Sequence, residues 1–358
     1  MSAHNTDTRG ILLIGDISRA FLDTGAVREL PCEVRTNMPD AIEAAAKNSF
    51  RAICIVMSGM SAKLSSALKA LREVNCEARI ILLAQMCEEP VAIQLVGSVS
   101  NETNVADDYL ICPIRLSRLV SRISYLAGVS RDVPVQAEAA ASSIVDAAME
   151  MKIKQLEKLA TEDDLTGLKN RRYIWEFSRQ IIKRAEKDNG RVTLLVFDVD
   201  NLKHYNDIYG HSAGDKILKQ AAVLMRRCCR GHDVVGRIGG DEFAVVFWDE
   251  PQRKQVGLET ERRSATAEHP KEAIFVAERF RRELERAELS VFTGLGPEGK
   301  GLLTISGGLA SFPRDASTVQ ELFQQADRAL LEAKRSGKNR IYLVGRPQND
   351  QADIALVE

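Results

Sequence analysis

Three features that would place this chain in a special class are missing from its sequence. No apolar run approaches the roughly 18 residues that a membrane-spanning helix needs. The first ten residues, MSAHNTDTRG, lack the apolar core of a secretory signal. None of the seven cysteines forms a C-x-x-C pair, so we expect incidental or buried thiols without a bound metal. These absences favour a cytoplasmic protein.

An excess of one charge is also missing. The formal net charge is -1, so the chain has no general attraction for nucleic acid or anionic membranes. No helix-turn-helix pattern follows the N-terminal half, which further disfavours a DNA-binding regulator. A length of 358 residues with 45% hydrophobic and 28% charged residues is typical of a globular protein with two domains.

The first predicted domain spans residues 10–129, where short apolar runs alternate with helical patterns. Such alternation predicts an α/β domain with a five-stranded parallel sheet covered on both faces. The expected strands are 11–15, 32–36, 52–57, 79–84 and 108–112, and the expected helices are 40–47, 65–74 and 115–126.

Residues 130–160 are predicted to form a linker that includes a helix. After a stretch of small and polar residues, apolar side chains recur at steps of three and four residues over barely two heptads. This stripe is compatible with a two-stranded coiled coil, and also with a helix that lies on its own domain. The stripe consists of Val145, Met149, Ile153, Leu156 and Ala160.

The second predicted domain spans 161–346 and has an α+β pattern with a mostly antiparallel sheet. The strands 234–238 and 243–248 are separated by GGDE and should form a hairpin. Residues 251–271 are polar and read as an insertion or loop, and 1–9 and 347–358 as tails. Further strands are expected at 191–197 and 302–308, and helices at 215–228, 273–285 and 319–334.

The hairpin turn carries two adjacent carboxylates, Asp241 and Glu242, whose mutual repulsion suggests a nearby cation. Asp198 ends the apolar strand 191–197. If the hairpin packs beside that strand, Asp198, Asp241 and the carbonyl of Val199 converge. Hard oxygens grouped in this way suit Mg²⁺, which completes its shell with substrate phosphates.

Backbone groups next to these acids also suit a phosphate ligand. A helix is expected directly after the strand, so the free N–H groups of Asn201, Leu202 and Lys203 would face the same phosphates. Gly239 and Gly240 are expected to give the turn positive φ angles and to leave room for a ligand.

Several ordered blocks in residues 161–346 resemble the GGDEF family, the diguanylate cyclases. The blocks are DDLTGLKNRR (163–172), FDVDNLKHYND (197–207), YGHSAGD (209–215), RIGGDEF (237–243), TISGGLA (304–310) and ADRALLEAKRSGKNR (326–340). The resemblance implies an enzyme that joins two GTP molecules into cyclic di-GMP and releases two pyrophosphates. It also implies a homodimer, because one domain binds only one GTP.

The resemblance assigns roles to individual residues. Two metal ions, Mg²⁺ or Mn²⁺, are implied in each half-site, and whether Asp241, Glu242 or water takes the proton stays open. The implied metal ligands are Asp198, Val199, Asp241 and Glu242. Asn206 and Asp215 match positions that hydrogen-bond the guanine edge, and Lys203, Lys334 and Lys338 match positions that neutralise phosphate. Substrate binding is further assigned to Asn201, Leu202, Arg237, Gly239 and Gly240.

A second site is implied nine residues before Gly239, where Arg230 and Asp233 stand in RGHD. The family carries an RxxD inhibitory motif at this distance, and Arg279 matches another arginine of that site. Arginine's planar fork suits both the Hoogsteen edge of guanine and phosphate. We therefore expect product inhibition by cyclic di-GMP. The alternative function is a catalytically silent cyclic di-GMP receptor that acts through protein contacts.

Residues 10–129 resemble a response-regulator receiver domain of the flavodoxin-like type whose phosphorylation site has been lost. Receivers carry a phosphoacceptor Asp at the end of strand three, where this chain reads IVMSG with Met57 or Ser58. Of the usual acidic pair after strand one only Asp16 is kept, and Cys112 precedes Pro113 where a Lys is usual. Without the carboxylate nucleophile no aspartyl phosphate forms, so a role in dimerisation or protein docking is expected.

Overall fold

The computed structural model describes residues 10–58, 64–97, 105–128, 137–248, 271–287 and 303–344. The chain divides into two compact units, Met1–Lys158 and Leu159–Glu358. The expected tails and most of the polar stretch 251–271 lie outside the described residues. Within the described residues, no helix is long and apolar enough to cross a membrane.

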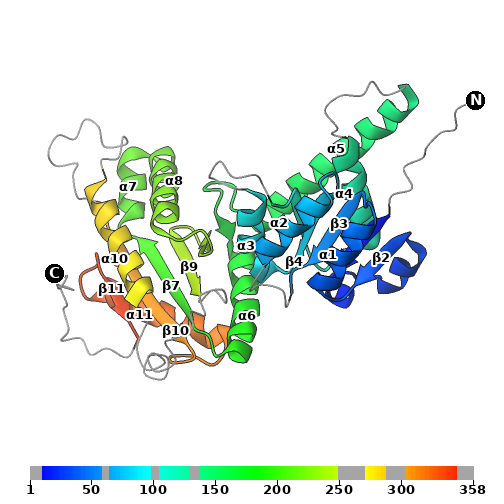
Figure 1. The fold of residues 1–358 in the computed structure, drawn as a ribbon. Coiled ribbons are helices and arrows are strands. Elements are labelled where there is room, and N and C mark those ends of the chain that lie inside the picture. The colour runs from blue at the N-terminus through cyan, green and yellow to red at the C-terminus, as the bar shows by residue number, and fades with distance from the viewer. Residues whose placement is uncertain are drawn as a thin grey trace, which may run out of the picture. The chain divides into compact units, whose positions relative to one another are not determined.

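The first unit is built on a five-stranded parallel sheet of order β2-β1-β3-β4-β5 (Figure 1). This is the strand order of flavodoxin-like doubly wound folds, and it confirms the predicted fold. The strands are β1 (Ile11–Ile14), β2 (Cys32–Arg35), β3 (Ala52–Val56), β4 (Arg79–Ala84) and β5 (Asp108–Ile111). The helices are α1 (Met38–Lys47), α2 (Leu64–Val74), α3 (Glu89–Val96) and α4 (Leu116–Gly128), with 3₁₀ turns at Ile17–Arg19, Thr24–Glu29 and Met86–Glu88.

Both faces of this sheet are covered, which explains why its strands are continuous apolar runs. Alternate residues of one strand enter different cores: Ile53 and Ile55 pack with residues of α1 and α2, and Cys54 and Val56 pack with residues of α4. At the carboxyl end of the strands, Ser58 donates a hydrogen bond to Glu88 at 3.3 Å.

One long helix, α5 (Ala137–Thr161), belongs to the first unit up to Lys158, and its last three residues belong to the second. Glu157 of this helix forms an ion pair with Arg118 of α4. Two members of the predicted apolar stripe, Met149 and Leu156, are 63% and 52% exposed. The coiled-coil role of this stripe stays a prediction.

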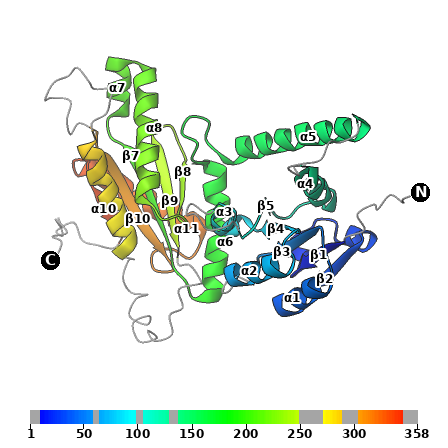
Figure 2. The same cartoon turned by 45° about the horizontal axis from the view of Figure 1, so that its top comes forward.

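The second unit has a six-stranded mixed sheet of order β11-β10-β7-β9-β8-β6, with antiparallel pairing in its centre (Figure 2). The mostly antiparallel sheet and the β8–β9 hairpin confirm the predictions. The strands are β6 (Lys169–Asn170), β7 (Val192–Val199), β8 (Val234–Arg237), β9 (Glu242–Trp248), β10 (Ile305–Phe312) and β11 (Ile341–Leu343). The helices are α6 (Arg171–Asp188), α7 (Leu202–Tyr209), α8 (His211–Cys228), α10 (Lys271–Arg286) and α11 (Val319–Arg335).

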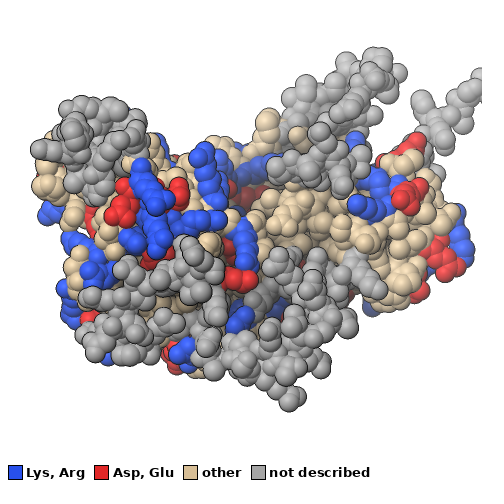
Figure 3. Space-filling model, turned by 60° about the vertical axis from the view of Figure 1, so that its left-hand side comes forward, with Lys and Arg blue, Asp and Glu red and all other residues tan. Residues whose placement is uncertain are grey.

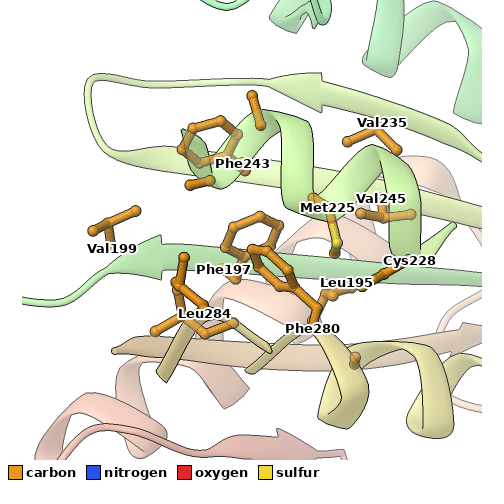
Figure 4. Packing of buried hydrophobic residues seen from close by; sticks show 14 of the residues in the cluster. Leu195, Phe197, Val199, Met225, Cys228, Val235, Phe243, Val245, Phe280 and Leu284 are labelled. Carbon is orange, nitrogen blue, oxygen red and sulfur yellow. The ribbon is translucent and has the colours of Figure 1, made fainter. Parts of the chain in front are cut away.

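The core of this unit lies between the sheet and helices α8 and α10 (Figure 4). Phe197 of β7 is fully buried at its centre. Its ring stacks on Phe243 at 5.2 Å between centroids and meets Phe280 edge-on at 5.1 Å. Because side chains alternate along a strand, burying Phe197 on this face directs its neighbour Asp198 to the opposite face.

Candidate active site

The predicted acidic residues meet where β7 and β9 lie side by side. Asp198 stands directly opposite Glu242 in the antiparallel register, so their side chains share one face of the sheet. The backbone N–H of Val199 donates to the carbonyl oxygen of Asp241 at 3.2 Å. The strand pairing therefore brings together the four residues that the sequence analysis named as metal ligands.

Asp198 is a buried carboxylate with an unusual charge environment. Only 5% of the residue is exposed, and Lys334 of α11 places its Nζ 2.8 Å from the carboxylate. Burial and, to a smaller extent, the nearby charge of Asp241 raise the pKa of Asp198, Lys334 opposes them, and the net result is a pKa of about 6. The position thus favours a cation beside the carboxylate.

The donor set fits a hard divalent cation that takes part of its shell from a substrate. Within the described residues, no group of three or more His, Cys, Asp or Glu side chains is close enough to hold a metal ion. Mg²⁺ typically uses one or two carboxylates together with substrate phosphates and water. Asp198 and Asp241, which sense each other's charge, match that smaller requirement.

Arg237, at the end of β8, holds the turn that carries Asp241. Its Nε and Nη2 donate to the carbonyl oxygen of Gly240 at 3.2 and 2.7 Å, and its Nη1 lies 3.2 Å from both carboxylate oxygens of Asp163. Burial acts to raise the pKa of Asp163, but hydrogen bonds from Thr166 and Arg237 outweigh it and lower that pKa. Sequence reasoning missed this clamp, and the assignment of Arg237 to substrate binding stays a prediction.

The expected positive φ angles of Gly239 and Gly240 are wrong. Neither glycine is among the residues with positive φ. The chain needs no tight two-residue turn here, because Ile238 and Gly239 both donate backbone hydrogen bonds to the Glu242 carbonyl and close a wider loop. Gly239 serves instead to leave space, since a Cβ there would lie 2.7 Å from the carboxylate of Glu242.

Helix α7 begins beside these acids, as predicted. Asn201, in the left-handed region at φ 60°, precedes the helix and accepts a hydrogen bond from Lys338 Nζ at 2.6 Å. The side chain of Leu202 is buried in the core, which leaves only its backbone N–H for the predicted contact with phosphate, whereas Lys203 is exposed. The start of α7 and the residues after α11 are thereby brought together.

Asp200 is a residue of this site that the sequence analysis missed. It is 1% exposed and accepts hydrogen bonds from Thr304 Oγ1 and Ser306 Oγ, both at 2.7 Å, and from the backbone N–H of Asn339 at 3.1 Å. These bonds join the end of β7 to β10 and to the loop that carries Lys338. The only sequence signal was its place two residues after Asp198.

The two residues matched to guanine recognition lie on neighbouring helices. Asn206 is on α7, and Asp215 is exposed near the start of α8, just after its first turn. The Oδ1 of Asn206 is buried and has no hydrogen-bond partner within the described residues. An amide oxygen in that state retains the capacity to accept a hydrogen bond.

The predicted inhibitory residues gather around the C-terminal end of α8. Arg230 donates its backbone N–H to Asp233 at 2.8 Å, and its guanidinium forms an ion pair with Glu272 of α10 at 3.3 Å. Burial raises the pKa of Asp233. Arg279, about two turns after Glu272 on α10, donates to the carbonyl of Cys228. Figure 3 shows basic and acidic side chains interspersed on this unit.

The family model described as "Diguanylate cyclase, GGDEF domain" matches residues 160–274 and 264–340. The chain is 31% identical over 201 residues to diguanylate cyclase A of Treponema denticola, covering 55% of this chain and 48% of that protein. It is 34% identical over 190 residues to diguanylate cyclase DgcS of Shewanella oneidensis, covering 53% and 54%. The matches therefore span about half the length of these relatives.

Among solved structures, the chain is similar to the coiled coil and GGDEF domain of DgcB from Caulobacter crescentus in complex with c-di-GMP. That likeness has 26% identity and a TM-score of 0.46, and it covers 58% of this chain and 97% of the other. The family model alone accounts for about half of the 358 residues, and it includes every acid and lysine assembled above. The chain belongs to the GGDEF family.

Proposed function

We propose that this protein is a diguanylate cyclase that condenses two GTP molecules into cyclic di-GMP and two pyrophosphates. The observation that carries the proposal is the pairing of Asp198 with Glu242 across β7 and β9, with Asp241 beside Val199. An acidic cluster at the end of a buried strand, next to a helix start and two lysines, suits a nucleoside triphosphate. Family membership and the similarity to named cyclases support the same chemistry.

Each protomer would hold one GTP. The N–H groups at the start of α7 donate hydrogen bonds to its phosphates. The phosphate charge is neutralised by the side chains of Lys203, Lys334 and Lys338. Asn206 and Asp215 hydrogen-bond the guanine edge. Asp198, Asp241 and the Val199 carbonyl would hold Mg²⁺ or Mn²⁺, which lowers the pKa of a bound hydroxyl and neutralises phosphate charge.

Two such protomers would complete the reaction by facing each other. The 3′-hydroxyl of each GTP attacks the α-phosphorus of the other, the new P–O bond forms, and the bond to pyrophosphate breaks. The hydroxyl proton passes to Asp241, Glu242 or water. The exposed apolar residues of α5 would favour this encounter if two helices pair, because tethering raises the effective concentration of the half-sites.

Arg230, Asp233 and Arg279 are proposed to bind cyclic di-GMP and to inhibit the enzyme. Arg230 is half-exposed and held by an ion pair between surface groups, which is weak, so its guanidinium is free to exchange partners. Arg230→Ala should therefore keep activity but lose inhibition by added product. Inhibition that is equally strong in this variant would contradict the assignment.

The activity is tested with purified protein, GTP and MgCl₂, followed by chromatography of the products. The proposal expects cyclic di-GMP and two pyrophosphates for each product formed, and loss of both in Asp241→Asn. Intact GTP from a protein that nevertheless binds cyclic di-GMP would support the silent receptor instead. Mg²⁺ is tested by replacing it with EDTA, which should stop the reaction.

A further inference from the structure

Helices α7 and α8 make an unusually close contact at Gly214. A Cβ placed on Gly214 would lie 1.9 Å from Oδ1 of Asn206, 2.9 Å from its Cγ and 3.2 Å from its Nδ2. Gly214 is in the first turn of α8 and is buried. The carboxamide of Asn206 thus occupies the space that any other side chain at position 214 would fill.

The backbone does not explain this glycine. Gly214 is not among the residues with positive φ, so its conformation is open to any residue. Alanine is also the better helix former by about 1 kcal/mol, and a glycine within a helix is normally a cost. The glycine is therefore explained by space: without a side chain at position 214, there is room for the carboxamide of Asn206.

The second observation concerns the state of the carboxamide. Its Oδ1 is buried without a hydrogen-bond partner in the part of the chain that the structure describes. A buried polar atom in this state costs free energy, and such atoms concentrate where a ligand or water completes the bonding. A guanine base supplies N–H donors at its N1 and 2-amino positions, as well as acceptors for the amide N–H₂ group.

We infer that Gly214 is a positioning residue that sets the base selectivity of the nucleotide site. Because Gly214 has no side chain, the carboxamide of Asn206 packs directly against α8, and this position lets it select guanine. This inference rests on the proposed function and adds a residue to it. Real Cβ atoms essentially never approach other heavy atoms closer than 3.0 Å. A methyl group at position 214 would displace the carboxamide from its place against α8, so that its proposed hydrogen bonds to guanine are lost whichever way the amide is turned.

The experiment measures equilibrium binding of α,β-methylene-GTP and α,β-methylene-ATP to the full chain, since neither analogue is cleaved at the reacting bond. Gly214→Ala should weaken binding of the guanine analogue by about tenfold or more, as expected for a lost buried hydrogen bond. It should change binding of the adenine analogue much less. Gly25→Ala, where a Cβ meets nothing within 4 Å, is the matched control and should leave both affinities unchanged.

A double-mutant cycle separates positioning from a general disturbance. If Gly214 acts through Asn206, then Gly214→Ala adds no further loss in the Asn206→Ala background. An equal loss in both backgrounds, or an unchanged guanine-to-adenine ratio in Gly214→Ala, overturns the inference. Absence of guanine preference in the unmodified protein would instead overturn the proposed function. The thermal midpoint of Gly214→Ala should not fall, because alanine favours the helix, and a large fall would also count against the inference.

Discussion

When the buried carboxyl group of Asp198 is ionised, it should lower the free energy of unfolding of the second unit. The size of this loss follows from the surroundings of Asp198. Burial raises its pKa from the ordinary 3.8 to about 6, so the folded unit binds the proton more tightly than the unfolded chain. Stability should therefore be greatest when Asp198 is protonated and should fall as the pH rises from about 4 to about 6. At about 1.4 kcal/mol for each pH unit, the full loss is about 3 kcal/mol.

The isosteric variant Asp198→Asn isolates this effect. An asparagine does not ionise, so the free energy of unfolding of the variant should not show this loss. As the pH rises from 4 to 7, the variant should therefore become about 2–3 kcal/mol more stable relative to the unmodified protein. Lysine ammonium groups stay charged throughout this range, so the loss of the Lys334 partner adds a constant offset only. Titrating acids that do not interact with Asp198 cancel in the comparison because both proteins contain them.

The assay is unfolding by urea in the presence of EDTA at several pH values, with tryptophan fluorescence as the signal. Both tryptophans, Trp175 and Trp248, belong to the second unit, so the signal reports on that unit alone. A difference between variant and unmodified protein that stays constant from pH 4 to 7 would refute the reasoning, and so would a difference that changes in the opposite direction. Either result would show that Asp198 is not buried beside Asp241 as described.

Three other predictions concern the clamp, the packing of α11 and the first unit. Arg237→Met removes the bonds to Gly240 and should lower the initial rate of cyclic di-GMP formation about tenfold or more, with little change in thermal midpoint; an unchanged rate would exclude a role in ordering the turn. Gly308→Ala should destabilise the second unit by about 1–3 kcal/mol in urea, whereas Gly240→Ala, with nothing within 4 Å of its Cβ, should not. Acetyl phosphate should add no phosphoryl group to residues 10–129 by intact mass, and modification of Asp16 would contradict the loss of receiver chemistry.

The sequence predicts the strands of this protein well because most of them are buried on both faces. The run 52–57 is apolar throughout and 79–84 is apolar after Arg79, and they match β3 and β4 within one residue. By contrast, β6 and β11 have two and three residues, too few for any periodic pattern. The helix α6 carried a readable signal, an Asn170 cap before buried apolar residues, but the sequence analysis left it unassigned.

The candidate site follows from sequence only as far as strand pairing determines it. Once β8 and β9 form a hairpin and β9 pairs with β7, Asp198 must stand near Glu242. The clamp between Arg237 and Asp163 spans 74 residues, so no local pattern indicates it. Asp200 was hidden for a related reason, since its partners Thr304 and Ser306 lie more than 100 residues away.

The contact between Lys334 and Asp198 shows how a long-range feature depends on one small residue. Helix α11 lies very close to β10, because a Cβ on Gly308 would be 2.1 Å from the carbonyl oxygen of Ala326 and 2.4 Å from the backbone nitrogen of Leu330. Those are backbone atoms of a helix, which cannot move away without shifting the whole element. Lys334 stands one turn beyond Leu330, so the depth at which α11 packs decides whether its ammonium reaches the buried carboxylate. Position 308 therefore controls the charge balance of a site to which it contributes no functional group.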